Sequence, residues 1–176
     1  MQPNSVKGKT LRQKLNVTLT LFLICTIIAA YYLVASTLNY TEFYRAIREI
    51  HLANLKVDAF VEQKDVNISL SFDIENPTGY IGLQLRSVTC QLYFLDNSEK
   101  VALWWDMRSY STDQRLDPRS KVPLEWNLNP TASAERFITY FETHQGAVNW
   151  TLECGVRLAA FLPRDISISF TENYNT

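Results

Sequence analysis

The sequence is poor in the residues from which most catalytic and metal sites are built. It contains two histidines, three cysteines and five glycines in 176 residues. His51 and His144 belong to no HxxxH or CxxC arrangement, which argues against a zinc site. The G-x-S-x-G, P-loop and G-x-G-x-x-G motifs are also missing. We therefore expect no catalytic residue, no metal and no cofactor, and interpret the chain as a non-enzymatic protein.

Charged residues are missing altogether from residues 15–41. Four of the 17 basic residues and none of the 18 acidic residues come before this stretch. A helix rises about 1.5 Å per residue, so the stretch exceeds the ~30 Å hydrocarbon core of a bilayer. It is also longer than the apolar region of a cleaved signal peptide. Because basic flanks stay in the cytoplasm, the sequence predicts a cytoplasmic tail over residues 1–14 and a transmembrane signal anchor over 15–41.

The rest of the chain is predicted to form one domain outside the cytoplasm. Residues 42–53 have apolar side chains at helical spacing and are expected to form a helical connector. Residues 54–172 are dominated by apolar–polar alternation, and residues 173–176 are interpreted as a tail. The alternating segments lie at 55–62, 66–75, 83–94, 101–105, 122–128, 148–160 and 166–171. This pattern is typical of a mainly β protein, a seven-stranded antiparallel β-sandwich of the fibronectin III or immunoglobulin type.

One helix is expected to interrupt the strands, between the fifth and the sixth. Thr131 is the expected N-cap, and Gly146 follows the expected end of the helix. Phe137, Ile138 and Phe141 are expected to form its apolar face.

Two segments resemble the LEA-2 (late embryogenesis abundant type 2) domain, also called the water-stress and hypersensitive-response (WHy) domain. In VNISLSFDIENPTGYIGLQLRSVTCQLYF, residues 66–94, Asn76-Pro77 lies between two long alternating strands, and RLDPRSKVPLEWNL, residues 115–128, matches a later turn and strand. The resemblance implies a sandwich with one helix behind an N-terminal membrane anchor, and roles in desiccation protection or lipid binding. From their own chemistry, Asn76 and Pro77 are interpreted as turn-forming residues and not as a binding site.

Cys90 and Cys154 both fall at inward positions of the predicted strands. Free cysteine is common in protein cores, whereas an oxidising compartment permits a disulfide between the two. The sequence leaves both alternatives open, because it does not give the distance between them.

Three glycosylation sequons lie beyond the apolar core of the predicted anchor, at Asn39, Asn67 and Asn149. Asn67 and Asn149 are at outward positions and are predicted N-glycosylation sites. The sequon at Asn16 lies on the cytoplasmic side and is expected to be unmodified.

Trp104 and Trp105 are neighbours in the sequence, so on a strand they point to opposite faces. One can enter the core while the other is exposed for contact with a partner or the membrane surface. Burial of both under a helix or loop is the alternative.

These observations predict a single-pass protein of the plasma membrane or of a vacuole- or lysosome-type membrane. Its expected partners are the lipid bilayer and other membrane proteins, to which it would be an accessory or structural subunit. The alternatives are binding or transfer of a lipid or another hydrophobic ligand, and protection against desiccation or osmotic stress. Nucleic acid is not an expected partner, because no broad basic surface follows the anchor. A filled core with an exposed apolar patch would favour a protein partner, and an open internal cavity would favour a ligand.

Overall fold

The computed structural model describes residues 5–62, 65–130, 133–159 and 165–176. The chain divides into two compact units, Met1–Tyr44 and Arg45–Thr176, which are treated separately. The first consists of most of α1 (Ser5–Glu49), and residues 16–49 of this helix are long and apolar enough to cross a membrane. The predicted helical connector over residues 42–53 extends further than the helix does in the structure. The helix stops at Glu49 and strand pairing begins at His51, because His51 lies opposite Glu75 in the first sheet.

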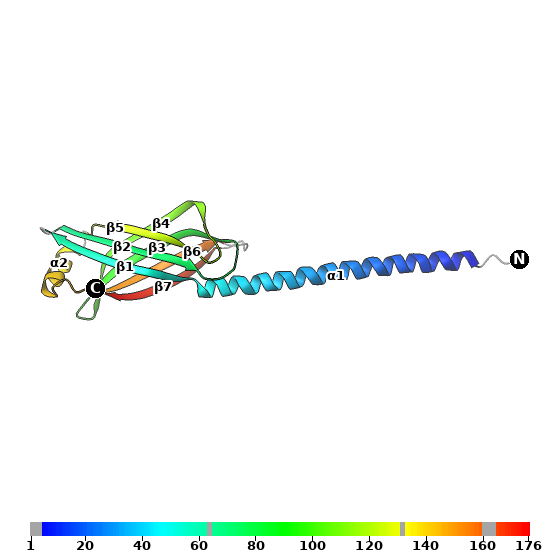
Figure 1. The fold of residues 1–176 in the computed structure, drawn as a ribbon, viewed down its shortest axis with the longest axis horizontal. Helices are drawn as coiled ribbons and strands as arrows, with labels where there is room; N and C mark the ends of the chain where they lie inside the picture. The colour runs from blue at the N-terminus through cyan, green and yellow to red at the C-terminus, as the bar shows by residue number, and fades with distance from the viewer. Residues whose placement is uncertain (1–4, 63–64, 131–132, 160–164) are drawn as a thin grey trace. The chain divides into compact units, whose positions relative to one another are not determined.

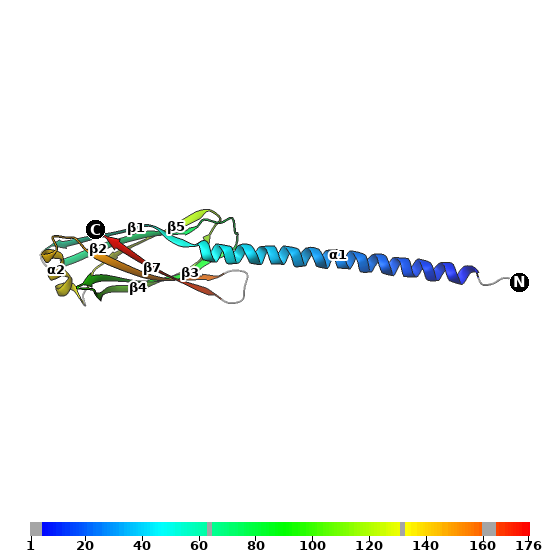
Figure 2. The same ribbon diagram turned by 90° about the horizontal axis from the view of Figure 1, so that it is seen from below.

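The second unit is built from two antiparallel sheets. The first, in the order β1-β2-β5, contains β1 (His51–Glu62), β2 (Asp65–Asn76) and β5 (Ser120–Leu128). The second, in the order β4-β3-β6-β7, contains β4 (Glu99–Leu116), β3 (Leu83–Asp96), β6 (Asn149–Ala159) and β7 (Ile166–Asn175). The sheets form two layers (Figures 1 and 2). The predicted mainly β architecture and the long apolar N-terminal helix are therefore confirmed.

Several strands are longer than the alternation indicates, and β4 and β7 show this at their C-terminal ends. The fourth was expected over residues 101–105, but β4 runs from Glu99 to Leu116, because β3 pairs with most of residues 99–109 and again with residues 114–116. β7 likewise continues to Asn175, through most of the expected tail, because Asn149 of β6 pairs with Asn175.

The core fills the space between the sheets with alternate residues of both. Phe72 of β2 stacks on Trp126 of β5 with ring centroids 5.4 Å apart, and both are buried. Each fully buried side chain of this size contributes about 1.5–3 kcal/mol to folding. In the second unit, the largest side chains with almost no exposed surface include Trp150, Phe72, Phe94 and Phe137.

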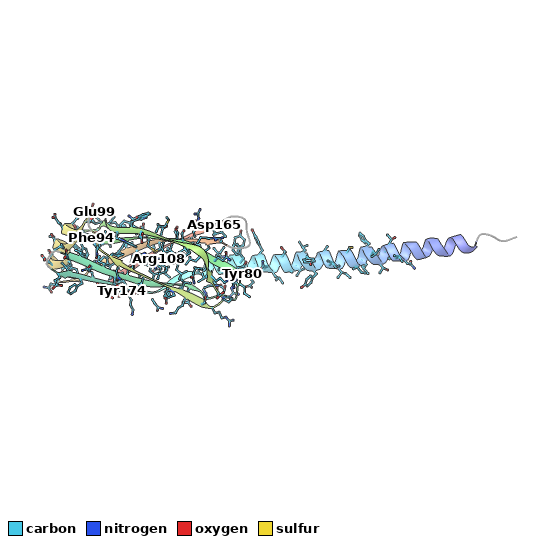
Figure 3. All side chains as sticks on the ribbon, turned by 90° about the horizontal axis from the view of Figure 1, so that it is seen from above. Tyr80, Phe94, Glu99, Arg108, Asp165 and Tyr174 are labelled. Carbon is cyan, nitrogen blue, oxygen red and sulfur yellow. A yellow bond between two sulfur atoms is a disulfide. The ribbon has the colours of Figure 1, made fainter. Side chains whose placement is uncertain are left out.

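Helix α2 (Ala134–Thr143) packs on the core through its aromatic face. The Phe137 ring lies 5.3 Å from Phe94 and 5.5 Å from Trp150, centroid to centroid. Phe94 lies at the end of the sandwich where α2 is found, and Tyr80 at the opposite end (Figure 3). The expected helix face was partly wrong, since Phe137 and Tyr140 are the buried residues rather than Ile138 and Phe141. Phe137 and Tyr140 are three residues apart, so they lie on the same face of the helix. Thr131 lies outside the described residues.

Asn76 ends β2 as a fully buried amide. Its Nδ2 lies 3.3 Å from the carbonyl oxygens of Leu116 and Asp117 and 3.4 Å from that of Tyr80, and donates to them. Its Oδ1 accepts from the Thr78 hydroxyl at 2.7 Å and from the Thr78 backbone N–H at 3.1 Å. Asn76 thus joins the β2–β3 connection to the β4–β5 turn. Both of these connections cross from one sheet to the other.

Asp73 of β2 fixes an irregularity in the neighbouring strand β1. The register shifts between Ala53 and Lys56, and Asn54 there has a left-handed φ of 55°. Asn54 Nδ2 donates to Asp73 Oδ2 at 2.7 Å, and Lys121 Nζ donates to the same oxygen at 2.8 Å. The hydrogen bond from Lys121, followed by that from Asn54, lowers the pKa of the Asp73 carboxyl. The ionised form of Asp73 is therefore favoured in the folded state.

We expect Asn76→Asp and Asn76→Ala to destabilise the domain by about 1–3 kcal/mol or more, because buried carbonyls lose their donor. Asn76→Ala removes the donor and the acceptor together, whereas Asn76→Asp keeps the acceptor but places a buried carboxylate beside three carbonyl oxygens, so Asn76→Asp should be the more destabilising variant. The measurement is urea unfolding of the full chain followed by tryptophan fluorescence. An unchanged free energy of unfolding for both variants would show that the two connections hold without the amide.

We expect the stability advantage of the natural chain over Asp73→Asn to depend on pH. The pKa of Asp73 is lowered on folding, so its stabilising effect is complete above the unfolded value of about 3.9 and is lost as the pH falls through the folded value. The difference in the free energy of unfolding should be constant between pH 5 and 7 and should shrink toward pH 2. A difference that is the same at pH 2 and pH 7 would contradict this account.

Candidate interaction surface

The two adjacent tryptophans are separated by an irregularity in β4. Leu92 lies opposite Trp104, whereas the next residue of β3, Tyr93, lies opposite Ala102, so Leu103 is an extra residue in β4. Leu103 is buried, and Trp104 turns toward Trp126 with ring centroids 5.9 Å apart. Trp105 consequently lies on the outer face and is 60% exposed. Such bulges redirect the side chains that follow them.

Trp105 borders a hollow on the outer face of the four-stranded sheet. Across the sheet, Trp105 lies opposite Gln91, and Met107, which is 52% exposed, lies opposite Thr89. The hollow has a volume of about 250 Å³ and extends over Gly155 to β7. A Cβ added at Gly155 would meet no atom within 4 Å, so this part of the face is open. We call Trp105, Met107, Thr89, Gln91 and Gly155 the Trp105 face.

The charges beside the Trp105 face are neutralised by local pairing. Lys100 Nζ donates to Glu153 Oε1 at 2.8 Å, and the Tyr93 hydroxyl donates to Glu153 Oε2 at 3.2 Å. The hydrogen bond from Lys100 is the main reason that the pKa of Glu153 is lowered, while burial is the main cause of the raised pKa of Tyr93. An apolar partner surface could therefore approach Trp105 without leaving Glu153 unpaired.

Cys90 and Cys154 lie opposite each other on β3 and β6, the two central strands of this sheet. Their Cα atoms are 4.2 Å apart, both side chains are buried, and the structure joins their sulfur atoms in a disulfide. The bond joins the two strands beneath the Trp105 face, since both residues are buried and both are among the residues that line the hollow.

The predicted glycosylation sites are on the surface. Asn67 is exposed in β2, directly opposite Phe60 of β1, and Asn149 is exposed at the first residue of β6. Asn39 is exposed on α1. Asn67 and Asn149, the two predicted sites, are therefore accessible in the second unit, whereas Asn39 lies within the stretch predicted to span the membrane.

Arg108 closes the side of the sandwich where the edge strands β4 and β5 face each other. Its guanidinium lies 4.6 Å from the centroid of the Trp126 ring and donates to the Glu125 carbonyl at 2.8 Å. Trp126 Nε1 in turn donates to Asp106 Oδ2 at 3.1 Å. Sequence reasoning missed this contact, because β4 and β5 belong to different sheets and no local pattern links them.

No group of three or more His, Cys, Asp or Glu side chains suited to a metal occurs in the part of the chain that the structure describes. His51 contacts the carbonyl of Glu49, and His144 caps the end of α2 through the carbonyl of Tyr140. The histidines thus lie at two helix ends and do not meet in one site.

Comparison of the sequence with protein-family models and with curated proteins gives no match. Solved structures share the fold. One is a solution structure of a candidate late embryogenesis abundant protein, with a TM-score of 0.50, 13% identity, and coverage of 100% of this chain and 91% of the other. Another is a solution structure of an Arabidopsis thaliana protein, with a TM-score of 0.51, 11% identity, and coverage of 73% of this chain and 80% of the other. At these identities the likeness concerns the fold alone, which is LEA-like.

We expect a non-reducing digest of the full chain to contain a linked Cys90–Cys154 peptide. Replacing both cysteines by alanine should lower the free energy of unfolding by about 2–4 kcal/mol, because the bond closes a long loop in the unfolded chain. Cys25→Ala is the matched control, since this exposed cysteine on α1 is free. Two free thiols at Cys90 and Cys154 in protein isolated without reductant would contradict the bond.

Proposed function

We propose that this protein is a non-enzymatic, single-pass membrane protein with a LEA-2-like β-sandwich outside the cytoplasm. In this proposal it acts as an accessory or structural subunit that binds another protein of the same membrane through the Trp105 face. The observation that carries the proposal is the exposure of Trp105 beside Met107 on one sheet face. Large aromatic residues and methionine are enriched at protein interfaces.

The proposed membrane anchor and its orientation in the membrane are argued from the first unit of the chain. Between Asn16 and Glu49, α1 is long and apolar enough to span a bilayer. The basic residues before it, with no acid among them, favour a cytoplasmic N-terminus. The second unit then faces the outside of a cell or the lumen of a vacuole- or lysosome-type compartment. A disulfide between Cys90 and Cys154 suits such an oxidising place.

The arrangement of hollows favours a protein partner over a ligand held between the sheets. The hollows of about 250, 390 and 420 Å³ each include outward-facing strand residues, such as Trp105, Phe60 and Lys56, in their lining. The space between the sheets contains closely packed aromatic rings, such as the stacked pair Phe72 and Trp126. A lipid carrier would instead need an apolar chamber with an opening.

Protection against desiccation or osmotic stress is the second candidate function, and the LEA-like fold supports it. This role predicts that loss of the protein harms cells only under drying or osmotic stress. An equal defect in unstressed cells would favour the subunit role.

We expect native mass spectrometry of the full chain, extracted gently from its own membrane, to detect a second protein in a fixed ratio. Trp105→Ser combined with Met107→Ser should abolish this complex, because it removes the apolar contact. Phe60→Ser is the matched control, since Phe60 is 61% exposed on the other sheet and Trp105 is 60% exposed.

A complex that survives the double substitution would refute the Trp105 face as the interface. A lone chain that carries lipid mass would refute the subunit role in favour of lipid binding. Protease added to sealed cells should cleave the second unit, and full protection of that unit would refute its placement outside.

A further inference from the structure

The first sheet has an exposed aromatic side chain that the proposed function does not use. Phe60 of β1 is 61% exposed and lies directly opposite Asn67 of β2. Directly opposed residues of an antiparallel pair share a face, with Cβ atoms about 4.5–5.5 Å apart. The Asn67 amide, the acceptor of the sequon Asn67-Ile68-Ser69, thus lies beside the exposed phenyl ring.

A hollow of about 390 Å³ adjoins this pair. Its lining includes Phe60, Asn67, Asp58, Asn127 and Ser69. Ser69 lies opposite Asp58 on one side and Asn127 on the other, so a small side chain is flanked by two larger polar ones. Phe60 thus gives the hollow an apolar side, and Asp58 and Asn127 give it polar groups. Its volume is within the range of ligand-binding pockets.

We propose that Asn67 carries an N-linked glycan whose first sugar lies against the Phe60 ring and occupies this hollow. The apolar C–H face of an N-acetylhexosamine can pack on the negative face of a phenyl ring. Its hydroxyl and acetamido groups can hydrogen-bond the Asp58 carboxylate and the Asn127 amide. Within the part of the chain that the structure describes, the side-chain amide of Asn67 makes no hydrogen bond that would compete with the sugar.

The attachment is a group transfer from a lipid-diphosphate-linked glycan. The bond between C1 of the sugar and the phosphate oxygen breaks, and a bond between C1 and Asn67 Nδ2 forms. The amide nitrogen loses one proton and the lipid diphosphate leaves, with no change in oxidation state. The inference rests on the proposed placement of the second unit outside the cytoplasm, where such donors are used.

The other sequons provide internal comparisons. Asn149 is also exposed, but the residue directly opposite it is Asn175, which carries no aromatic ring. Asn16 precedes the apolar core of α1 and lies on the predicted cytoplasmic side. A glycan at Asn149 would therefore report the compartment without packing on a ring, and a glycan at Asn16 would report the opposite orientation.

The test is a double-substitution cycle on the full chain, produced in a cell that attaches N-glycans. Glycopeptide mass analysis should show an N-acetylhexosamine on Asn67. Phe60→Ala should lower the midpoint of thermal unfolding by roughly 2–4 °C when the glycan is present, the shift expected for a loss of about 1 kcal/mol. In the background of Asn67→Gln, Phe60→Ala should have a much smaller effect. Ser69→Ala should act like Asn67→Gln, and Ser69→Thr should preserve the glycan.

Each other outcome overturns the inference in a distinguishable way. An unmodified Asn67 with a glycan on Asn149 refutes the Asn67 site while the outside placement stands. No glycan on either residue refutes the site, and protease protection of the second unit would then show whether the placement has failed as well. An equal shift for Phe60→Ala with and without the glycan refutes the contact with the ring.

Discussion

The buried amide of Asn76 is the interaction on which the arrangement of the two sheets depends. The β2–β3 connection and the β4–β5 turn both cross between the sheets, and Asn76 forms hydrogen bonds with both. A buried carbonyl without a donor costs free energy, so these bonds restrict the paths that the two connections can take. Strands β3 and β5 begin directly after them. The hydrogen bonds of Asn76 therefore fix where β3 and β5 begin, and with it the register in which each strand pairs with its neighbours.

The Trp105 face follows from a local irregularity on this frame. The extra residue Leu103 is buried, and the next residue, Trp104, is half-buried against Trp126. Trp105 is then on the outer face, although it shares the alternation of Val101 and Leu103 in the sequence. The bond between Cys90 and Cys154 joins the two central strands beneath it. A fixed backbone under an exposed aromatic ring lowers the entropic cost of binding a partner.

The two sheets differ on their outer faces in a way that relates to the proposed roles. The four-stranded sheet exposes Trp105 and Met107 beside paired charges, which suits a protein contact. The three-stranded sheet combines an exposed ring with a sequon, which suits a covalently attached sugar. In the proposed role, a membrane anchor would keep the domain close to proteins of the same membrane, so a modest interface would be occupied at a high effective concentration.

The sequence alone determined the features that depend on local pattern. The charge-free residues 15–41 predicted the apolar helix. The alternation of apolar and polar residues predicted the mainly β domain, because alternate side chains of a strand point to the same face and one face is buried. Asn76 could be recognised as a turn former, but its bonds to residues about 40 positions away could not. The exposure of Trp105, the contact of Arg108 with Trp126, and the pairing of Phe60 with Asn67 were decided only by the tertiary structure. Each depends on register or on the approach of two sheets, and these are set by the packing of the whole core.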